Sequence, residues 1–470
     1  MEVRPQVLTD PALLNHNVVK YLNSKSAFWL ILVLGVVARI LPLISLSTVP
    51  LASDALSYHK MAERIVLAEN FSPYFPPGLP YYLSIWYFFF GSNEFIGRLS
   101  MILIYILVAT TLYLVAEKLA SRRAANLSVL MISFYPAFIL QSIEPLTQLP
   151  AALCLVALVY LLLDVPLSSP AFMQWLRPII IGILLAFVTL IRPSCLLLVI
   201  AVPIFGGIRS RMFWPSVTAF LVAAIIISVW LHKAHDMTGR FVMINDANAL
   251  NFFFGNNPYT PIYKTWWFGS HSAGDVDVPS DYTAMYQSIR SLPPAERDAK
   301  LRQIAIDHIT SRPDLFLLRT INRIRVFFAF DSATGSSLRE AYSFNTAASL
   351  TVIAIDAIAY FTIMLLAIFF MFIYRGSGFS SEHFFLLLGM ILIYSMPYWI
   401  SFSHPAYHTP IVPILAVLAG IAGDELMKAQ KRSLVATFWF PKSKRYALLA
   451  CLAVFLLIQT EWVLFNLSRI

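Results

Sequence analysis

The sequence predicts an all-α polytopic membrane protein. Of its 470 residues, 59% are hydrophobic and only 13% are charged, whereas soluble domains are about 45–50% apolar and about 25% charged. The mean hydropathy is +0.71, and apolar stretches of about 20 residues, the length that spans a bilayer as a helix, recur throughout the chain. Helices are expected because exposed backbone cannot be left unsatisfied in lipid, and no alternating strand pattern is present.

Apolar windows predict about 11 transmembrane helices. The windows are residues 27–49, 95–116, 124–141, 145–163, 178–191, 193–206, 214–232, 350–374, 384–400, 408–425 and 446–465. Arg192-Pro193 separates the fifth and sixth windows, so this pair can also form one broken or re-entrant element. The predicted parts are an N-terminal segment (1–26), a first transmembrane part (27–232) with an outer loop (50–94), a cap (233–349) and a C-terminal transmembrane part (350–470).

The net charge of +9 indicates an orientation in the membrane rather than a nucleic-acid partner. Lysine and arginine concentrate in alternate short segments, while the loops near 141–144 and 401–406 carry none. By the positive-inside rule the N-terminus is cytoplasmic, and the loop at 50–94 and the cap at 233–349 are extracytoplasmic. The three cysteines, Cys154, Cys195 and Cys451, lie in apolar runs and are expected to be packing residues.

Asp54 is the first candidate for chemistry. It follows the first span and starts a predicted short helix that also carries Tyr58, His59 and Glu63. A carboxylate at the membrane boundary lies where an acceptor from water could meet a donor carried by lipid. Asp is also a common helix cap, and both roles can hold together. His59 and Glu63 could tune Asp54 or bind a divalent cation, or form a solvated helix face.

Other candidates interrupt later apolar windows. Arg192 is an ionisable residue at membrane depth, which favours a function, although an arginine at a helix end can also snorkel to water. His404 and His408 would share one face of a helix, or else lie in a loop-to-helix junction. No metal site is predicted, because this pair lacks further ligands. Glu144 either lines a cavity on the side of Asp54 or stabilises a helix start.

In the predicted cap, amides and aromatic residues indicate a sugar-contacting surface or an interfacial anchor. The residues are Asn256, Asn257, Tyr259, Lys264, Trp266 and Trp267. Asp356, in the outer part of the eighth window, has no predicted role.

The order of the motifs resembles the polytopic GT-C glycosyltransferases. Asp54 and Tyr58 are followed by Pro76-Pro77-Gly78-Leu79-Pro80 and an aromatic stretch ending at Gly91. Further matches are Phe134-Tyr135-Pro136 with Glu144, Leu190-Ile191-Arg192-Pro193, Gly255-Asn256-Asn257-Pro258, and Ser403-His404-Pro405-Ala406-Tyr407-His408-Thr409-Pro410. The resemblance covers about residues 30–425 and is nearest to the bacterial branch related to protein O-mannosyltransferases and the lipid A aminoarabinose transferase.

The resemblance implies a GT-C-like bundle with extracytoplasmic juxtamembrane helices, in a bacterial inner membrane. It implies an inverting enzyme that moves a sugar from a polyprenyl-phosphate carrier to a lipid, glycan or protein acceptor outside the cytoplasm. Asp54 would be the general base and Glu144 a second acidic residue. The donor phosphate would contact Arg192, His404, Tyr407 and His408, and the sugar or acceptor would contact Tyr58, His59, Asn256, Asn257 and Lys264. No resident cofactor is implied, and a divalent cation stays open.

Two departures and three alternatives accompany this prediction. Phe75 and Ala406 stand where the family often has a basic residue and an arginine, and both positions bear on the donor phosphate. A glycolipid transporter or flippase would show inverted repeats, which the sequence lacks. A non-catalytic scaffold of an envelope-polysaccharide complex would tolerate loss of Asp54, and aminoacyl or phosphate-group transfer is an enzymatic variant. The sequon Asn70-Phe71-Ser72 leaves an endoplasmic reticulum setting open.

Overall fold

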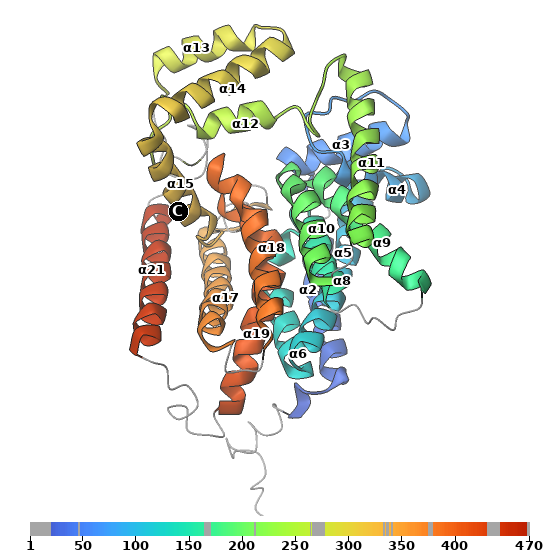
Figure 1. Cartoon of the computed structure of the whole chain (residues 1–470), viewed down its shortest axis with the longest axis vertical. Coiled ribbons are helices and arrows are strands. Elements are labelled where there is room, and N and C mark those ends of the chain that lie inside the picture. The colour runs from blue at the N-terminus through green and yellow to red at the C-terminus, as the bar shows by residue number, and fades with distance from the viewer. Residues whose placement is uncertain are drawn as a thin grey trace, which may run out of the picture.

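The computed structural model is a bundle of long helices that carries a smaller group of helices at one end (Figure 1). The structure describes residues 20–45, 48–163, 171–210, 213–263, 265, 278–331, 334, 338–339, 342–374, 379–429 and 442–467. These residues contain no β-strand. The fold class predicted from composition is therefore confirmed.

The helices follow one another along the chain as the hydropathy windows predict. Their bounds are α2 Lys25–Ser45, α3 Ser53–Val66, α4 Gly78–Phe90, α5 Glu94–Leu119, α6 Arg122–Ser133, α7 Pro136–Leu140, α8 Gln148–Leu162, α9 Ala171–Ile191, η1 Pro193–Cys195, α10 Leu196–Ser210, α11 Phe213–Thr238, α12 Asn248–Gly255, α13 Ser280–Arg290, α14 Pro294–Ser311, α15 Pro313–Phe327, α17 Thr346–Ile373, α18 Ser381–Ile400, η3 Pro405–Ile411, α19 Val412–Ala429 and α21 Lys442–Leu467.

Eight helices in the described part of the chain are long and apolar enough to cross a membrane, so the protein is a multi-pass membrane protein. They are α2, α5, α9, α11, α17, α18, the run formed by η3 and α19, and α21. The other three windows are helices too, but shorter. Residues 124–141 divide between α6 and α7, whereas α8 and the run from Pro193 to Gly207 are short apolar helices.

Two groups of helices meet along α19. In Figure 1 the helices coloured blue and green, α2 to α11, stand beside α17, α18, α19 and α21 in orange and red. Helix α19 packs against α6 on one side and α17 on the other. A side chain at Gly420 would collide with Ser128 and with the backbone of Ala124. Glycine thus lets α19 and α6 approach closely, as is typical of helix pairs in membranes.

The two predicted outer segments lie at the same end of the bundle. In Figure 1, α3 and α4 lie in the upper part of the picture, as do α12, α13 and α14, while α6 lies toward the lower end of the bundle. The helices above the bundle pack around a small core of Phe253, Tyr282, Ile289 and Leu301. The arrangement agrees with the alternation of loops predicted from charge, and the side of the membrane on which this end lies stays a prediction.

Candidate active site

Asp54 lies in the first turn of α3. The residue is exposed at the surface, although neighbouring groups partly shield its carboxyl from water. The residue before the helix is Ala52, and no side chain caps the helix start. Ser53 adopts a φ of 50°, in the left-handed region that a residue with a side chain seldom occupies. Asp54 is therefore not the cap of this helix. No hydrogen bond reaches its carboxylate from the described residues, so it is available to another partner.

Asp54 is close enough to Arg192 for the two charges to act on each other. Burial raises the pKa of the Asp54 carboxyl above its ordinary value, and the positive charge of Arg192 opposes this rise. Burial also raises the pKa of Tyr58, where the charge of Asp54 adds to the rise and that of Arg192 opposes it. The fold thus brings together Asp54 and Tyr58 from the first outer loop and Arg192 from the far end of α9.

Arg192 lies at the break between α9 and η1, with an extended backbone. Proline at the next position disfavours the helical conformation at Arg192, so α9 ends here, with the Arg192 amide still donating to the Val188 carbonyl at 2.8 Å. Its side chain is 7% exposed, and its Nη1 donates to Tyr394 Oη at 3.1 Å and Tyr398 Oη at 2.7 Å. It pairs with no carboxylate among the described residues, and its Nε has no hydrogen-bond partner there. Arg192 is therefore a buried cation, and it does not snorkel to water.

Aromatic rings line the surroundings of Arg192. The guanidinium lies 5.5 Å from the ring centre of Tyr407 and 6.0 Å from that of Tyr398, and these two rings stack at 5.0 Å. The phenol of Tyr58 lies close to Thr147, and its ring packs edge-on against Phe75 at 5.2 Å. Phe75, at the position where a basic residue was expected, thus packs beside the site and adds no charge to it.

His404 and His408 point to different parts of the molecule. The segment from Pro405 to Ile411 is a 3₁₀ helix, which has about 3 residues per turn, so side chains four positions apart do not share a face. His404 precedes this helix, and its Nδ1 accepts a hydrogen bond from the Ala406 amide. His408 Nδ1 lies 2.7 Å from the Phe327 carbonyl oxygen. The His404 ring makes an edge contact with Tyr407, whose ring lies beside Arg192, whereas the His408 ring packs on Tyr360.

Glu144 and His59 each have a partner away from Arg192. Glu144 accepts a hydrogen bond from the Tyr342 hydroxyl, which also accepts one from Arg98. His59 Nδ1 lies 2.7 Å from the Tyr87 hydroxyl, and its Nε2 lies 3.4 Å from Glu63. These contacts tie the outer loops together, and direct roles of Glu144 and His59 toward a substrate stay predictions.

Asn256 and Asn257 are buried and bind backbone. Asn256 donates to the carbonyls of Phe252 and Ile400. Asn257 accepts from the amides of Tyr259 and Thr260 at 2.9 and 2.8 Å. This geometry gives both amides a role in shaping the loop, so a contact with sugar stays a prediction for them. Lys264, Trp266 and Trp267 lie outside the described residues.

Two further arginines hold this loop against the bundle. Arg319 donates to the carbonyls of Asn257 and Thr260. Arg323 donates to the Gly255 carbonyl, the Asn256 side chain, and the carbonyls of Trp399 and Ile400 at 3.3 and 3.0 Å. Because Ile400 ends α18, Arg323 joins the cap to the helix that carries Tyr394 and Tyr398.

Tyr394, Tyr398 and Thr147 are the site residues that the sequence did not reveal. Tyr394 and Tyr398 lie four apart in α18, and their hydroxyls face Arg192. Their spacing of four residues, which places two hydroxyls on one helix face, is the sequence feature that could have predicted them as site residues. Thr147 precedes α8 and had no signal beyond its short outer loop.

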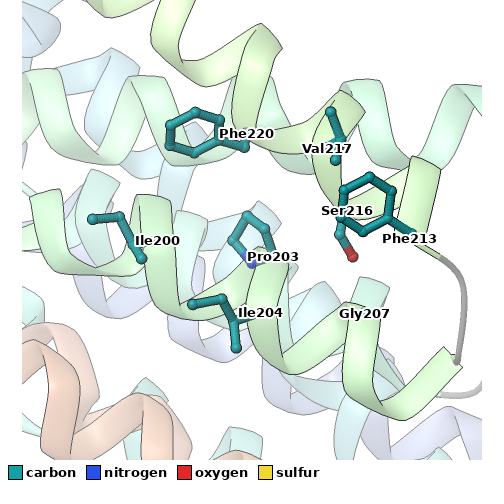
Figure 2. Close-up of a pocket in the computed structure, with 8 residues that line it drawn as sticks. All are labelled: Ile200, Pro203, Ile204, Gly207, Phe213, Ser216, Val217 and Phe220. Carbon is teal, nitrogen blue, oxygen red and sulfur yellow. The ribbon is translucent and has the colours of Figure 1, made fainter.

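The residues that the structure describes contain no group of three or more His, Cys, Asp and Glu side chains that could hold a metal ion. They do form an apolar groove of about 580 Å³ elsewhere, between α10 and α11. Figure 2 shows Ile200, Pro203, Ile204 and Gly207 facing Phe213, Ser216, Val217 and Phe220 across it. None of the candidate site residues lines this groove, so it is distinct from the region around Arg192.

Comparisons with solved structures give distant likenesses that cover most of the chain. The archaeal oligosaccharyltransferase AglB from Archaeoglobus fulgidus, in complex with an inhibitory peptide and a dolichol-phosphate, is 16% identical with a TM-score of 0.48, over 93% of this chain and 55% of AglB. ArnT from Cupriavidus metallidurans, bound to undecaprenyl phosphate, is 13% identical with a TM-score of 0.42, over 89% of this chain and 82% of ArnT. The chain thus spans about half the length of AglB.

No curated protein matches the sequence. Residues 75–232, however, match the family model of dolichyl-phosphate-mannose-protein mannosyltransferases. This region runs from the Pro-Pro-Gly loop through Glu144 and Arg192 to the end of the seventh predicted span. The resemblance predicted from the motifs is confirmed, and the chain is similar to the GT-C glycosyltransferases of the protein mannosyltransferase branch.

Proposed function

We propose that the protein is an inverting glycosyltransferase that moves a sugar from a polyprenyl-phosphate carrier to an acceptor at the outer face of a bacterial inner membrane. The observation that supports this most is the approach of a carboxylate, Asp54, to a buried and unpaired cation, Arg192. Transfer from a lipid phosphate needs a base for the acceptor and positive charge for the leaving phosphate. The family match, over residues 75–232, points to the same class of donor.

In the proposed reaction Asp54 removes the proton from an acceptor hydroxyl or amine. The acceptor atom bonds to the anomeric carbon of the sugar on the face opposite the phosphate, and the bond from that carbon to the phosphate oxygen breaks. The electron pair leaves with the polyprenyl phosphate, and the configuration at the carbon inverts. The proton ends on Asp54, which must release it to solvent before the next turnover.

Arg192 and its two tyrosines are the proposed phosphate site. Guanidinium groups suit phosphate oxygens because their donors form a rigid fork. The Tyr394 and Tyr398 hydroxyls accept hydrogen bonds from Arg192. Tyr394 donates its own hydrogen to the Tyr407 carbonyl at 2.9 Å, whereas the Tyr398 hydroxyl, which also accepts from Ser194, can donate its hydrogen to a ligand. As charge develops on the leaving oxygen, aimed donors of this kind stabilise the transition state more than the ground state. Tyr407 and His404, beside them, complete the proposed site.

Donor binding is expected to strengthen the base. Because Arg192 lowers the pKa of Asp54, a phosphate that neutralises this charge lets the pKa of Asp54 rise. A carboxylate with a higher pKa takes a proton more readily in the transition state. Asp54 would thus be the stronger base when the sugar donor is bound than when the site is empty.

The acceptor is proposed to be a lipid, glycan or protein on the side of the membrane where α3 and the cap lie. The orientation rests on the short loops without lysine or arginine at this end of the bundle. Tyr58, one turn after Asp54 in α3, is proposed to contact the acceptor.

The test is transfer of a labelled sugar from a polyprenyl-phosphate donor in membranes that contain wild type or Asp54→Asn. We expect a loss of about 10²–10⁴-fold, the usual contribution of a general base. Glu69→Gln, which removes an exposed carboxylate just beyond the same helix, is the matched control and should keep full activity. Transfer that survives in Asp54→Asn would remove the base assignment, and donor translocation without product would favour a transporter.

A further inference from the structure

The helix formed by α6 and α7 is interrupted inside the bundle at Phe134-Tyr135-Pro136. Helix α6 ends at Ser133, and α7 begins at Pro136 after Tyr135 in an extended conformation. In a continuous helix the carbonyls of Ile132 and Ser133 would accept from the amides of residues 136 and 137. Pro136 has no amide hydrogen, so the break leaves backbone groups that need other partners in a region without water.

Arg39 supplies partners for the carbonyls on the α6 side. Its side chain reaches from α2, is fully buried, and donates to the Ser133 oxygen at 2.9 Å and the Ile132 oxygen at 3.3 Å. A third bond joins it to the Gly35 carbonyl at 2.8 Å, and its guanidinium lies 3.3 Å from the ring centre of Tyr105. These are the two carbonyls that lose their helical donors at the break.

Asp356 supplies a partner for the amide on the α7 side. It reaches from α17, is also fully buried, and its Oδ1 accepts from the Ala137 amide at 2.6 Å. In an unbroken helix that amide would bind the Ser133 carbonyl, which Arg39 now occupies. A basic side chain and an acidic side chain therefore replace the two backbone hydrogen bonds that the break removes.

The break decides where the following segment lies. Helix α7 leads into residues 141–147, where Gln141 donates to the Thr409 hydroxyl at 3.2 Å and Thr147 lies close to the Tyr58 phenol. Thr409 belongs to η3, next to Tyr407, and Tyr58 belongs to the helix of Asp54. A continuous helix in place of the break would carry this segment away from both.

We propose that Arg39 and Asp356 are positioning residues: they hold the α6–α7 helix open, and thereby fix residues 141–147 between the Asp54 helix and η3. The positioning of the segment follows from the contacts alone, and only its consequence for catalysis rests on the proposed function. The proposal gives Asp356 a role. It also explains the Phe-Tyr-Pro motif, because the interruption at this motif frees the backbone groups that Arg39 and Asp356 bind.

The test is amide hydrogen exchange, measured by mass spectrometry on the full chain in lipid nanodiscs without substrate. In Asp356→Ala the Ala137 amide loses its acceptor, so we expect exchange in residues 134–147 to rise by about tenfold or more. Asp356→Asn keeps an oxygen at the same place and should stay within about twofold of wild type. Ser349→Ala, which removes a buried polar group from the same helix, is the control and should change nothing.

Three outcomes would overturn the proposal: unchanged exchange at 134–147 in Asp356→Ala, equal deprotection in Asp356→Asn, or a rise that is as large in residues 294–311 of the cap. If Asp356→Ala does not accumulate in membranes, Asp356→Glu replaces it, because it keeps the charge but displaces the oxygen. It should raise exchange in the same segment, and wild-type exchange would contradict the proposal. Since no sugar donor is used, failure here is distinguishable from failure of the proposed reaction.

Discussion

Two buried arginines in this protein have similar burial and different surroundings. Arg323, 1% exposed, donates to three backbone carbonyls and one side-chain amide. Arg192, 7% exposed, donates to two tyrosine hydroxyls and leaves its Nε without a partner in the described structure. Neither burial nor an unpartnered Nε identifies a functional cation by itself, because Arg39 and Arg319, which hold backbone carbonyls, also have a buried Nε without a partner in the described structure.

The kind of partner explains the difference. A backbone carbonyl only accepts, and at the end of a helix it has no alternative donor inside the bundle, so Arg323 completes a structural joint. A hydroxyl both accepts and donates, so Tyr398 can turn its hydrogen to an anion that binds Arg192, while Tyr394 donates its hydrogen to the Tyr407 carbonyl. Burial lowers the pKa of Arg323 to about 9, with Arg319 nearby adding to the effect, so it still carries its charge at neutral pH.

The largest effect is expected for Arg192→Met, and it distinguishes an arginine that binds a ligand from one that only holds backbone. Arg192→Met should weaken binding of undecaprenyl phosphate by about 30-fold to 5,000-fold, because removal of one partner from a buried charged contact costs about 2–5 kcal/mol. The midpoint of thermal unfolding should change little, since the two tyrosines can bind each other or water. Binding can be measured with undecaprenyl phosphate and the purified protein in nanodiscs.

Arg323→Met is the matched control and should give the opposite pattern. It leaves the carbonyls of Gly255, Trp399 and Ile400 without their donor, at about 1–3 kcal/mol for each group that finds no new partner. The unfolding midpoint should therefore fall while the affinity for undecaprenyl phosphate stays close to that of wild type. Equal effects of the two variants on binding would remove the distinction drawn here.

The acidic limb of the pH profile provides the next test. A general base works only when deprotonated, so activity should fall as the pH drops through the pKa of Asp54, which burial raises above its ordinary value. Arg192 opposes this rise. Conversion of Arg192 to Met should therefore move the limb to higher pH, measured on the residual kcat/KM. A limb at the same pH in both enzymes would show that another group limits the rate.

The sequence predicted the spans and the two charged residues of the site because both are local signals. Hydrophobicity places a helix in lipid without reference to its neighbours, and a charge such as Asp54 or Arg192 at the edge of an apolar window is conspicuous. The short helices α6 and α8 were also recognised as apolar windows, although their lengths depend on Pro136 and on the loop at Glu144.

What the sequence could not give was how polar groups are satisfied across helices. In the sequence, Tyr394 and Tyr398 cannot be distinguished from ordinary interfacial aromatic residues. Their role is visible only once α18 is packed against the break after α9. His404 and His408 could share one helix face or lie in a loop-to-helix junction. The structure has the second arrangement, because His404 precedes the 3₁₀ segment Pro405–Ile411 that contains His408. Arg39 and Asp356 are far apart in sequence, so their shared helix break was visible only in three dimensions.

Asn257 gives the smallest expected effect and tests the same distinction on an amide. Its side chain accepts from the amides of Tyr259 and Thr260, so Asn257→Ala should lower stability by about 1 kcal/mol and leave the KM for the acceptor unchanged. Asn257→Asp keeps the accepting oxygen, so its stability should lie between that of wild type and that of Asn257→Ala. A rise in KM without a change in the unfolding midpoint would instead give Asn257 a direct contact with the sugar or acceptor. In that case Asn257 would serve ligand binding, as is proposed for Arg192, and would not serve only to hold backbone, as Arg323 does.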